Sequence, residues 1–347
     1  MNPLRANPTN AWKTPSRRAV LAGAACAVTA SAFAAERPVV GHVERMDPGL
    51  DAVIEADAPV ETLVGGYVRG EGPVWVGGAD GYLLTTDAQA NVLFRWSERD
   101  GGSQWLSPAG WAGPPDPALA EPGIFGMCLG RGGVIYADGG TRTVGVIDLK
   151  TRKKTVLCSQ FEGKRFNSPN DVVLGPDGSI YFTDPPYGLT GRGASPVREM
   201  DYTGLFRIAP DNTVSVVDRT LDPNGIAMGP DGRTLYVTDN DKWLAITLDD
   251  HGRATDKRVF FKATPAMRGG DGMRMDGAGN LWCSSLIGIC VISPEGKLLG
   301  AIHANDSERN CEFGADGHLY ITARTQLLRV KVKAKKLLWP VWRETFT

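Results

Sequence analysis

The sequence predicts an all-β fold, a six-bladed β-propeller with four-stranded blades and a metal site at the mouth of its central channel. Three observations lead to this fold class. Glycine and proline (43 and 23 residues) make up about a fifth of the 347 residues, more than a helical protein tolerates. No stretch beyond the first 35 residues keeps a hydrophobic period of about 3.6 residues. A glycine turn followed by a strand-like run recurs six times.

Each copy of the repeat joins a tight turn to an alternating strand. Asp177-Gly178 is followed by the run Ser179 to Asp184, and Asp231-Gly232 by Arg233 to Asp239. Asp-Gly adopts the positive φ angles of a hairpin turn, so the run after it is predicted to be a strand. The spacings between copies, 52, 45, 54, 47 and 38 residues, are typical of four-stranded propeller blades. The turn glycines are Gly81, Gly133, Gly178, Gly232, Gly279 and Gly317.

The first 35 residues are predicted to be an export signal rather than part of the fold. They hold four basic residues and no acidic one. Ser16-Arg17-Arg18 precedes a small apolar run that ends at Ala32-Phe33-Ala34, the pattern of a bacterial signal peptide and its cleavage site. The paired arginines favour the twin-arginine route, so we expect a periplasmic protein with no membrane span after signal removal. A lipoprotein attached through Cys26 and a short membrane anchor are the alternatives.

Residues 45–347 are predicted to form a single six-bladed propeller domain. A ring of blades has to be closed by pairing its last strands with its first. The strand-like stretch from Gln326 to Val332 is expected to pair with an early strand around Val60 to Val64.

Charge and cysteine content narrow the function classes. The formal net charge is −1, from 38 Lys+Arg and 39 Asp+Glu, which argues against a nucleic-acid partner. The five cysteines after the leader form no complete disulfide set and no CxxC metal motif, so we expect small buried hydrophobic side chains. Cys283 and Cys290 could instead face each other across a hairpin and oxidise. The five are Cys128, Cys158, Cys283, Cys290 and Cys311.

Polar residues recur at one register position ahead of the hairpin glycines. Asn170, Asn224 and Asp271 each precede the turn glycine of their copy by eight residues. Glu71 precedes its own by ten, and Asn310 in the last copy by seven. The innermost strand of each blade lines the channel of a propeller, and the residues at its start crowd around the mouth. We therefore expect these side chains to converge on the channel axis.

Two carboxylates and two amides at a common point suit a hard divalent cation, because two negative charges balance it. The expected ligands are Glu71, Asn170, Asn224 and Asp271. Ca²⁺ is favoured because no His or Cys ligand stands there to favour Zn²⁺. The competing interpretation is that these Asn and Asp residues only cap turns before strands. Their matched register in four copies favours the metal site.

Several segments, in this order along the chain, are specific enough to suggest a family. They are Glu71-Gly72-Pro73-Val74-Trp75, Gly163 to Asp171, Tyr181 to Leu189, Pro223-Asn224-Gly225, Asp271-Gly272-Met273 and Asn310 to Gly314. Together they resemble the gluconolactonase/senescence-marker-protein (regucalcin-like) family of six-bladed propellers, most closely its exported bacterial gluconolactonases. The resemblance covers essentially the whole chain after the leader. It implies hydrolysis of sugar lactones such as glucono-1,5-lactone with a divalent ion, often Ca²⁺ and sometimes Zn²⁺ or Mn²⁺.

The resemblance also implies roles for individual residues. It makes Glu71, Asn170, Asn224 and Asp271 the metal ligands, in agreement with the register, and gives Asp271 the additional role of general base. A cation polarises the lactone carbonyl, and a nearby carboxylate can then take a proton from the attacking water. Asp171 and Asp184 are the reserve candidates for the base.

Other residues are expected near the substrate. Arg165, Asp184 and Tyr187 are candidates for binding the sugar. Phe125 stands where many relatives carry Asn, so it replaces a polar contact with an apolar wall and favours a less hydroxylated or aromatic lactone. The segment Gly101 to Gly123, with two tryptophans, is predicted either to form a lid or to be a passive connection.

Other function classes remain open at this stage. A phosphotriesterase-like hydrolase could use the same metal site, and a non-catalytic sugar- or protein-binding propeller would use the fold without it. A serine hydrolase is not supported, because the chain has no Gly-x-Ser-x-Gly. The partner is expected to be a small sugar lactone; the physiological lactone, the native metal and the oligomeric state stay open.

Overall fold

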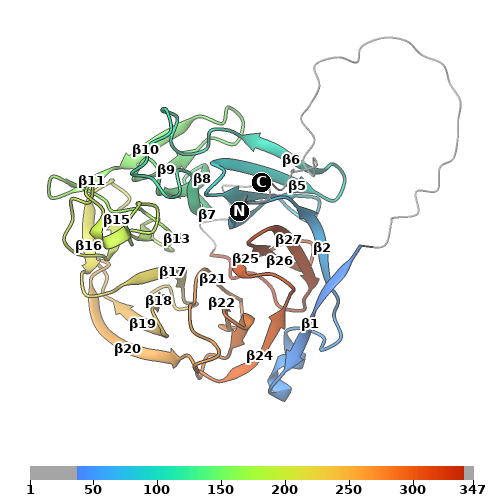
Figure 1. Ribbon diagram of the computed structural model, residues 1–347. Coiled ribbons are helices and arrows are strands. Elements are labelled where there is room, and N and C mark those ends of the chain that lie inside the picture. Colours follow the sequence, from blue (N-terminus) through green and yellow to red (C-terminus); the bar gives the residue numbers. More distant parts are fainter. Residues whose placement is uncertain (1–36, 340–347) are drawn as a thin grey trace, which may run out of the picture.

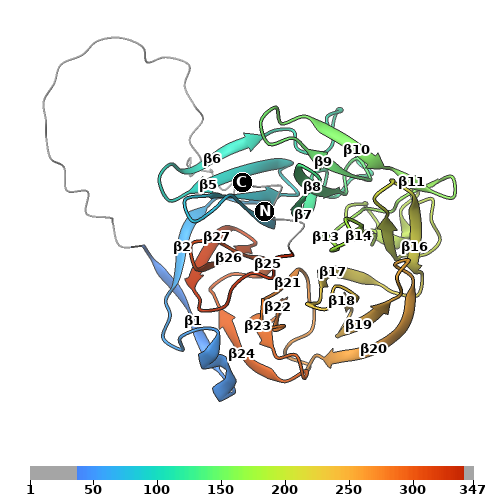
Figure 2. The same ribbon diagram turned by 180° about the vertical axis from the view of Figure 1, so that it is seen from behind.

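The computed structural model describes residues 37–339, in which antiparallel sheets are arranged in a ring (Figures 1 and 2). The predicted export signal, 1–35, lies outside the described residues. Within 37–339 the helical elements are two short 3-10 helices, η1 (Pro48–Ala52) and η2 (Arg192–Ala194). None of the helices described there has the length and apolar character needed to cross a membrane.

Four sheets have four strands each, and hydrogen-bonded neighbours follow one another in the chain. The first is β3 (Gly70–Val76), β4 (Tyr82–Asp87), β5 (Val92–Ser97) and β6 (Gly101–Leu106). The second is β7 (Ile124–Gly130), β8 (Gly133–Asp138), β9 (Thr143–Ile147) and β10 (Lys154–Cys158). The third is β13 (Val172–Leu174), β14 (Ile180–Thr183), β15 (Leu205–Ile208) and β16 (Val214–Asp218), and the fourth is β17 (Pro223–Met228), β18 (Thr234–Asp239), β19 (Lys242–Leu248) and β20 (Ala254–Lys262). A small hairpin, β11 (Gln160–Phe161) with β12 (Lys164–Arg165), joins the second sheet to the third.

The remaining strands form one nine-stranded sheet with two four-stranded units inside it. One unit is β21 (Met273–Met275), β22 (Leu281–Ser285), β23 (Gly288–Ile292) and β24 (Leu298–His303). The other is β25 (Glu308–Phe313), β26 (His318–Ala323), β27 (Gln326–Lys331) and β2 (Val60–Gly65), with β1 (Val39–Arg45) between the units.

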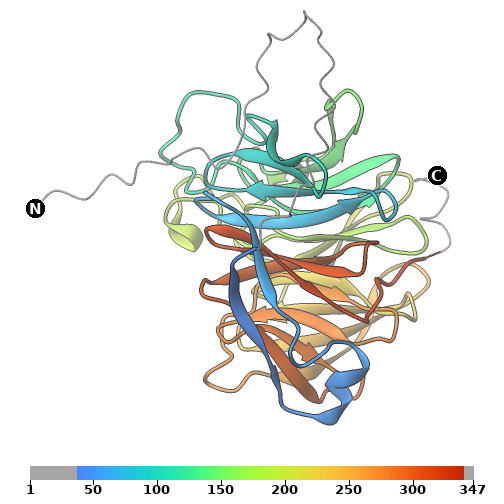
Figure 3. The same ribbon diagram turned by 90° about the vertical axis from the view of Figure 1, so that its right-hand side faces the viewer.

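The predicted closing pair is confirmed, because β2 pairs antiparallel with β27, with Val60 opposite Val330. The sequence analysis did not foresee β1. This strand pairs with β2 through its first residues and with β24 through His42 to Arg45, opposite 300–303. A side view shows β1, in blue, at the outer edge of the ring (Figure 3). The seam between the first and last parts of the chain is therefore paired on both sides of β1.

The hydrophobic core lies between neighbouring sheets. Between the second and third sheets, Phe166, Phe182 and Phe206 are fully buried, and each pair of rings lies 5.1 to 5.4 Å apart. Edge-to-face and stacked aromatic pairs of this kind add to the stabilisation that apolar burial provides. The cysteines behave as expected: Cys283 and Cys290 are fully buried and free, and they are directly opposite each other across β22 and β23.

The first strand of each four-stranded unit faces the channel. These inner strands contact one another around the ring, from β3 to β7, β13, β17, β21 and β25 and back to β3. All begin at the same end of the channel, here called the entrance mouth and defined by Glu71, Asn170, Asn224 and Asp271. Their other ends meet at the far end, defined by Trp75, Met228, Met275 and Phe313.

Candidate functional site

Glycines allow the inner strands to approach closely at the entrance mouth. A Cβ atom on Gly225 would collide with the carbonyl oxygen of Asp271, and one on Gly72 with that of Phe125. Only glycine lets the backbones come this close, and Gly72 also has a positive φ of 41°. The Glu-Gly and Asn-Gly pairs of the repeat thus place one site residue directly beside the next.

Irregular pairing directs side chains toward the mouth. The ladder of β17 slips between Pro223 and Ile226, around Asn224, and the ladder of β25 slips around Arg309. Such bulges leave a residue out of the ladder and reorient its side chain. The carbonyl of Arg309 accepts a hydrogen bond from Gly272 N at 2.9 Å, so this bulge is fixed beside Asp271.

Two of the predicted ligands are carboxylates whose charges interact, one buried (Glu71) and one partly buried (Asp271). Glu71 is 4% exposed. Burial raises the pKa of Glu71 well above its usual value, and the negative charge of Asp271 raises it further. Burial also raises the pKa of Asp271, while Arg309 and Arg69 lower it. Two carboxylates held together in a desolvated place are more stable as ions when a cation lies between them.

Of the two predicted amide ligands, Asn224 lies beside Asp271, whereas the backbone of Asn170 contacts Gly126 and Thr183. The Nδ2 of Asn224 lies 3.4 Å from Gly270 O, and its Oδ1 is buried without a hydrogen-bond partner. Asn170 is 7% exposed and is held by hydrogen bonds of its backbone to Gly126 and Thr183. The orphaned Oδ1 of Asn224 is an acceptor ready for a cation or a donor group. The residues present therefore fit a divalent cation.

The candidate metal site combines carboxylate and amide side chains. Among residues 37–339 no group of three or more His, Cys, Asp or Glu side chains is placed to hold a metal. The expectation from sequence is compatible with this finding, since it contains only the two carboxylates, Glu71 and Asp271. Amide oxygens complete oxygen-rich Ca²⁺ sites well, whereas Zn²⁺ sites depend on His and Cys.

The sequence analysis missed three charged residues at this mouth. Arg309 Nη1 lies 3.4 Å from Asp271 Oδ2. Arg69 Nη1 lies 2.9 Å from Glu121 Oε1, and its Nε lies 3.9 Å from Glu71 Oε1. The sequence did carry a signal for the two arginines. Arg309 directly precedes Asn310, and Arg69 precedes Glu71 by two residues. Glu121 carries no such signal, since a connecting loop brings it to the site.

That loop follows β6 and is tied to another part of the ring. Ala120 N donates to Gly188 O at 2.9 Å, and Thr190 N donates to Ala118 O at 2.8 Å. Of the two tryptophans that suggested a lid, Trp105 belongs to β6 and is 6% exposed in the core. The segment Gly101 to Gly123 is thus a strand followed by a hydrogen-bonded loop that presents Glu121 to the mouth.

Among the expected substrate contacts, Tyr187 is one whose pKa is affected by the charge of Asp271 at the mouth. It is half-buried, and the guanidinium of Arg192 lies 5.3 Å from its ring centre. Burial raises the pKa of Tyr187 to about 12, with further contributions from the charges of Asp222 and Asp271. Its hydroxyl is therefore neutral at physiological pH.

Phe125 and Arg165 lie in contrasting surroundings. Phe125 starts an inner strand, as expected, but is only 2% exposed, and its ring lies against Gly139. Arg165 is exposed on the β11–β12 hairpin, and its Nη2 donates to Thr141 O at 3.2 Å.

The structure corrects the role expected for Asp184. This residue is fully buried, and its carboxylate accepts hydrogen bonds from Asn167 N at 2.7 Å and Ser168 N at 2.8 Å. Burial raises the pKa of Asp184 to about 7, against the lowering effect of these donors. Asp184 therefore anchors the loop that carries Asn170, and its burial leaves no surface for a substrate or a water molecule.

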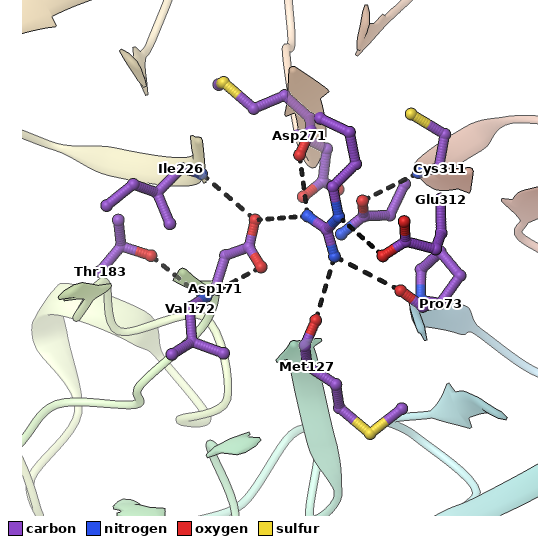
Figure 4. A network of polar contacts seen from close by, with 12 residues as sticks. Pro73, Met127, Asp171, Val172, Thr183, Ile226, Asp271, Cys311 and Glu312 are labelled. Atoms are coloured by element: carbon purple, nitrogen blue, oxygen red, sulfur yellow. Dashed lines mark hydrogen bonds and ion pairs between the residues drawn. The ribbon is translucent and has the colours of Figure 1, made fainter. Parts of the chain in front are cut away.

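Asp171, the other reserve base, belongs to a network deeper in the channel (Figure 4). Asp171, Arg274 and Glu312 are here called the channel hub. Arg274 Nε lies 3.3 Å from Glu312 Oε2, and its Nη1 lies 4.0 Å from Asp171 Oδ2. The Nη2 of Arg274 donates to Met127 O at 3.0 Å and Pro73 O at 3.4 Å. The hub thus ties β21 to β3, β7, β13 and β25 and is a structural element.

A cavity of about 520 Å³ lies beyond the hub, at the far end. Its lining is mostly apolar and includes Trp75, Met228 and Met275, and residues 334–338 line part of it. Arg274 and Glu312 also line this cavity. It is distinct from the entrance mouth, where the unpaired polar atoms and interacting carboxylates lie, and we assign the chemistry to the mouth for that reason.

Comparison with known proteins places the chain among lactone hydrolases and their relatives. It is 38% identical to a gluconolactonase of Zymomonas mobilis over 331 residues, 89% of this chain and 92% of the relative. It is 26% identical to regucalcin of Xenopus laevis, covering 74% and 83% of the two chains. Pentonolactonase XacC of Haloferax volcanii is 26% identical, covering 67% and 72%.

Solved structures agree with the sequence relatives. The X-ray structure of a putative gluconolactonase superposes with a TM-score of 0.76 at 30% identity, over 85% of this chain and 99% of the other. The gluconolactonase XC5397 of Xanthomonas campestris gives a TM-score of 0.72 at 28% identity, over 85% and 97%. The model of the SMP-30/Gluconolactonase/LRE-like region matches residues 69–325, from Arg69 at the entrance mouth to the turn before β27. The chain therefore belongs to the SMP-30/gluconolactonase/LRE-like family.

Proposed function

We propose that this protein is a six-bladed β-propeller that hydrolyses sugar lactones, such as glucono-1,5-lactone, to the open acid with a divalent cation at the entrance mouth. The observation that carries the proposal is the unpaired Oδ1 of Asn224 near two interacting carboxylates, the buried Glu71 and the partly buried Asp271. The relatives named gluconolactonase and pentonolactonase supply the reaction class.

Glu71, Asn170, Asn224 and Asp271 would hold the cation, and Ca²⁺ is the ion we propose. When bound, it would supply Lewis-acid polarisation of the lactone carbonyl. The four side chains come from β3, β17 and the residues just before β13 and β21, so rigid strands fix their relative positions.

Asp271 is the proposed general base. Its carboxylate takes a proton from water as the water oxygen attacks the lactone carbonyl carbon. The ring C–O bond then breaks, and the departing oxygen takes up a proton to become the hydroxyl of the product acid. Burial raises the pKa of Asp271, and Arg309, 3.4 Å from Asp271 Oδ2, opposes this effect and so favours the ionised form of the base.

Three further residues would shape the substrate site. The neutral hydroxyl of Tyr187 can both donate to and accept from a sugar hydroxyl. Arg165 can reach a substrate from its exposed hairpin. Phe125 stands where a polar contact would otherwise lie, but it is only 2% exposed, so we propose that its buried ring shapes the wall behind the substrate rather than touching it. We also propose that the leader exports the protein to the periplasm by the twin-arginine route.

Acid release from glucono-1,5-lactone by the mature protein tests the proposal. The rate above the spontaneous hydrolysis of the lactone is measured before chelation, after chelation, and after adding back Ca²⁺, Zn²⁺ or Mn²⁺. We expect rapid hydrolysis that chelation abolishes and Ca²⁺ restores best. Hydrolysis that resists chelation would overturn the cation's role. A protein that binds Ca²⁺ but hydrolyses no lactone would overturn the reaction, and phosphotriesters would be tested next.

A further inference from the structure

The entrance mouth carries arginine N–H donors that no residue among 37–339 uses. The Nε atoms of Arg69 and Arg309 are both buried and have no hydrogen-bond partner. Each guanidinium has five N–H donors in a planar fork, a shape that matches a carboxylate. Donors that are buried yet unused cost free energy unless a ligand satisfies them.

Both arginine side chains are partly accessible. The side chains of Arg69 and Arg309 are 25% and 24% exposed, so a ligand at the mouth can touch each of them. Arg69 is held by Glu121 at 2.9 Å, whereas Arg309 approaches Asp271 only at 3.4 Å. One arginine thus pairs with Glu71 and Glu121 and the other with Asp271, and each keeps an Nε donor without a hydrogen-bond partner.

Charge balance points to the missing partner. The directly interacting side chains here are three carboxylates, Glu71, Glu121 and Asp271, and two guanidinium groups, a net charge of −1. The proposed divalent cation would change this to +1. A neutral lactone would leave the positive charge uncompensated in a partly desolvated place, whereas a lactone with one carboxylate would neutralise it.

We propose that Arg69 and Arg309 bind a carboxylate of the substrate, so that the preferred substrates are sugar lactones that also carry an acidic group, the lactones of aldaric acids. This inference rests on the proposed lactonase function and narrows its substrate class. The alternative is that the arginines only compensate the crowded acids. The channel hub is an example of arginine in a purely structural role, since the donors of Arg274 are directed to three backbone carbonyls and a carboxylate.

A matched pair of lactones tests the proposal. Glucaro-1,4-lactone and glucono-1,4-lactone share a ring and differ at C6, a carboxylate in the first and a hydroxymethyl group in the second. We expect the wild-type kcat/KM to favour glucaro-1,4-lactone by about tenfold or more, the effect of one to two charge-assisted hydrogen bonds. Arg69→Gln and Arg309→Gln should each reduce this preference strongly. Arg233→Gln, on an exposed turn that pairs with Asp250, removes the same charge and should leave the preference unchanged.

Binding supplies a readout that does not depend on turnover. Isothermal titration of the Ca²⁺-loaded protein with glucarate and gluconate should show glucarate binding about tenfold more tightly, and Arg309→Gln should abolish the difference. If 6-phosphogluconate bound more tightly than glucarate, the proposal that the two arginines bind a carboxylate would be wrong, and a phosphate would be their ligand.

Failure of the substrate class can be told apart from failure of the function. If neither lactone is hydrolysed, the proposed function is wrong. If both are hydrolysed equally and the arginine variants slow both alike, the lactonase stands and the anionic substrate is wrong. Circular dichroism of each variant confirms folding, and Arg69→Gln keeps the test decisive if Arg309→Gln does not fold.

Discussion

The entrance mouth and the channel hub are built from the same residue types, arginine with aspartate and glutamate. They differ in how far the hydrogen-bonding groups of these side chains are satisfied. At the hub, Arg274 donates to the carbonyls of Met127 and Pro73 and pairs with Glu312. At the mouth, Arg69 and Arg309 keep buried Nε atoms without hydrogen-bond partners. Buried charge with satisfied hydrogen bonds holds the ring together at the hub, whereas several unsatisfied donors and acceptors gather at the mouth, where we propose that a ligand binds.

The size of these effects supports the distinction. An unsatisfied buried polar group costs about 1–3 kcal/mol. Four such atoms lie at the mouth, on Arg69, Glu121, Asn224 and Arg309. A ligand that satisfies them recovers this free energy, so the mouth is less stable without its ligand than the hub is. Variants at the two places should therefore separate loss of catalysis from loss of stability.

The largest expected effect is at the mouth. Asp271→Asn removes the proposed base and one ligand charge, and turnover of glucono-1,5-lactone should fall by about 10³-fold or more. The melting temperature should change little, because the amide keeps the shape of the side chain. Asp211→Asn, on an exposed turn, is the matched control and should hydrolyse the lactone normally. A normal rate for Asp271→Asn would remove this residue from the mechanism.

The second-largest effect is expected at the hub, where a substitution should lower the stability of the protein rather than its turnover. Arg274→Met leaves the buried Asp171 without its cation and Glu312 with Lys336 alone, and the free energy of unfolding in urea should fall by about 3–5 kcal/mol. Lys336→Met removes the other partner of Glu312, 2.9 Å away, and should cost about 1 kcal/mol or less because Lys336 lies nearer the surface. Equal losses for the two variants would contradict the central role of Arg274.

A third test uses pH. Burial and the charge of Asp271 raise the pKa of Glu71, so the folded, chelated protein binds a proton at higher pH than the unfolded chain does. Between the pKa of Glu71 in the unfolded chain and its higher pKa in the folded protein, the free energy of unfolding therefore falls as the pH rises. Ca²⁺ must displace this proton, so the rise in melting temperature on adding saturating Ca²⁺ should be larger at pH 7.5 than near pH 5. Melting curves with NaCl at equal ionic strength are the control. If the rise in melting temperature on adding Ca²⁺ did not change with pH, Ca²⁺ would not bind at Glu71.

The smallest expected effect concerns the edge of the mouth. Tyr187→Phe removes one hydroxyl that we propose contacts the sugar, and KM should rise about two- to tenfold with kcat little changed, the effect of one neutral hydrogen bond. Tyr82→Phe, on β4 under Arg95, serves as the control with unchanged KM. A fall in kcat for Tyr187→Phe would mean that this hydroxyl takes part in the reaction itself.

Local patterns in the sequence were sufficient for much of the fold. Asp-Gly turns and alternating strands predicted the repeated sheets, and the pairing of β2 with β27 followed from the need to close a ring. The register before each turn also predicts that the site residues converge on the channel axis; this stays a prediction, although the backbones of Gly225 and Asp271 do approach closely. These successes share a cause, since turn chemistry and strand alternation act over a few residues.

The missed features depend on contacts between distant residues. Strand β1 has no turn signal of its own and is fixed by β24, some 260 residues away. Glu121 reaches the mouth only because its loop bonds to Gly188, and Asp184 looked available until the structure showed it fully buried. Burial and loop placement are products of the whole ring, so no local pattern contains them.

The seam at β1 and β2 has a consequence for how the chain matures. Strands β1 and β2 can pair with each other early, but Val60 meets Val330, and His42 meets His303, only when the last strands have been made. During synthesis the other edges of these two N-terminal strands stay without their partners while almost the entire polypeptide leaves the ribosome. Completion of this protein is therefore a post-translational event, and its early strands are the segments for which a chaperone would have the longest time to act.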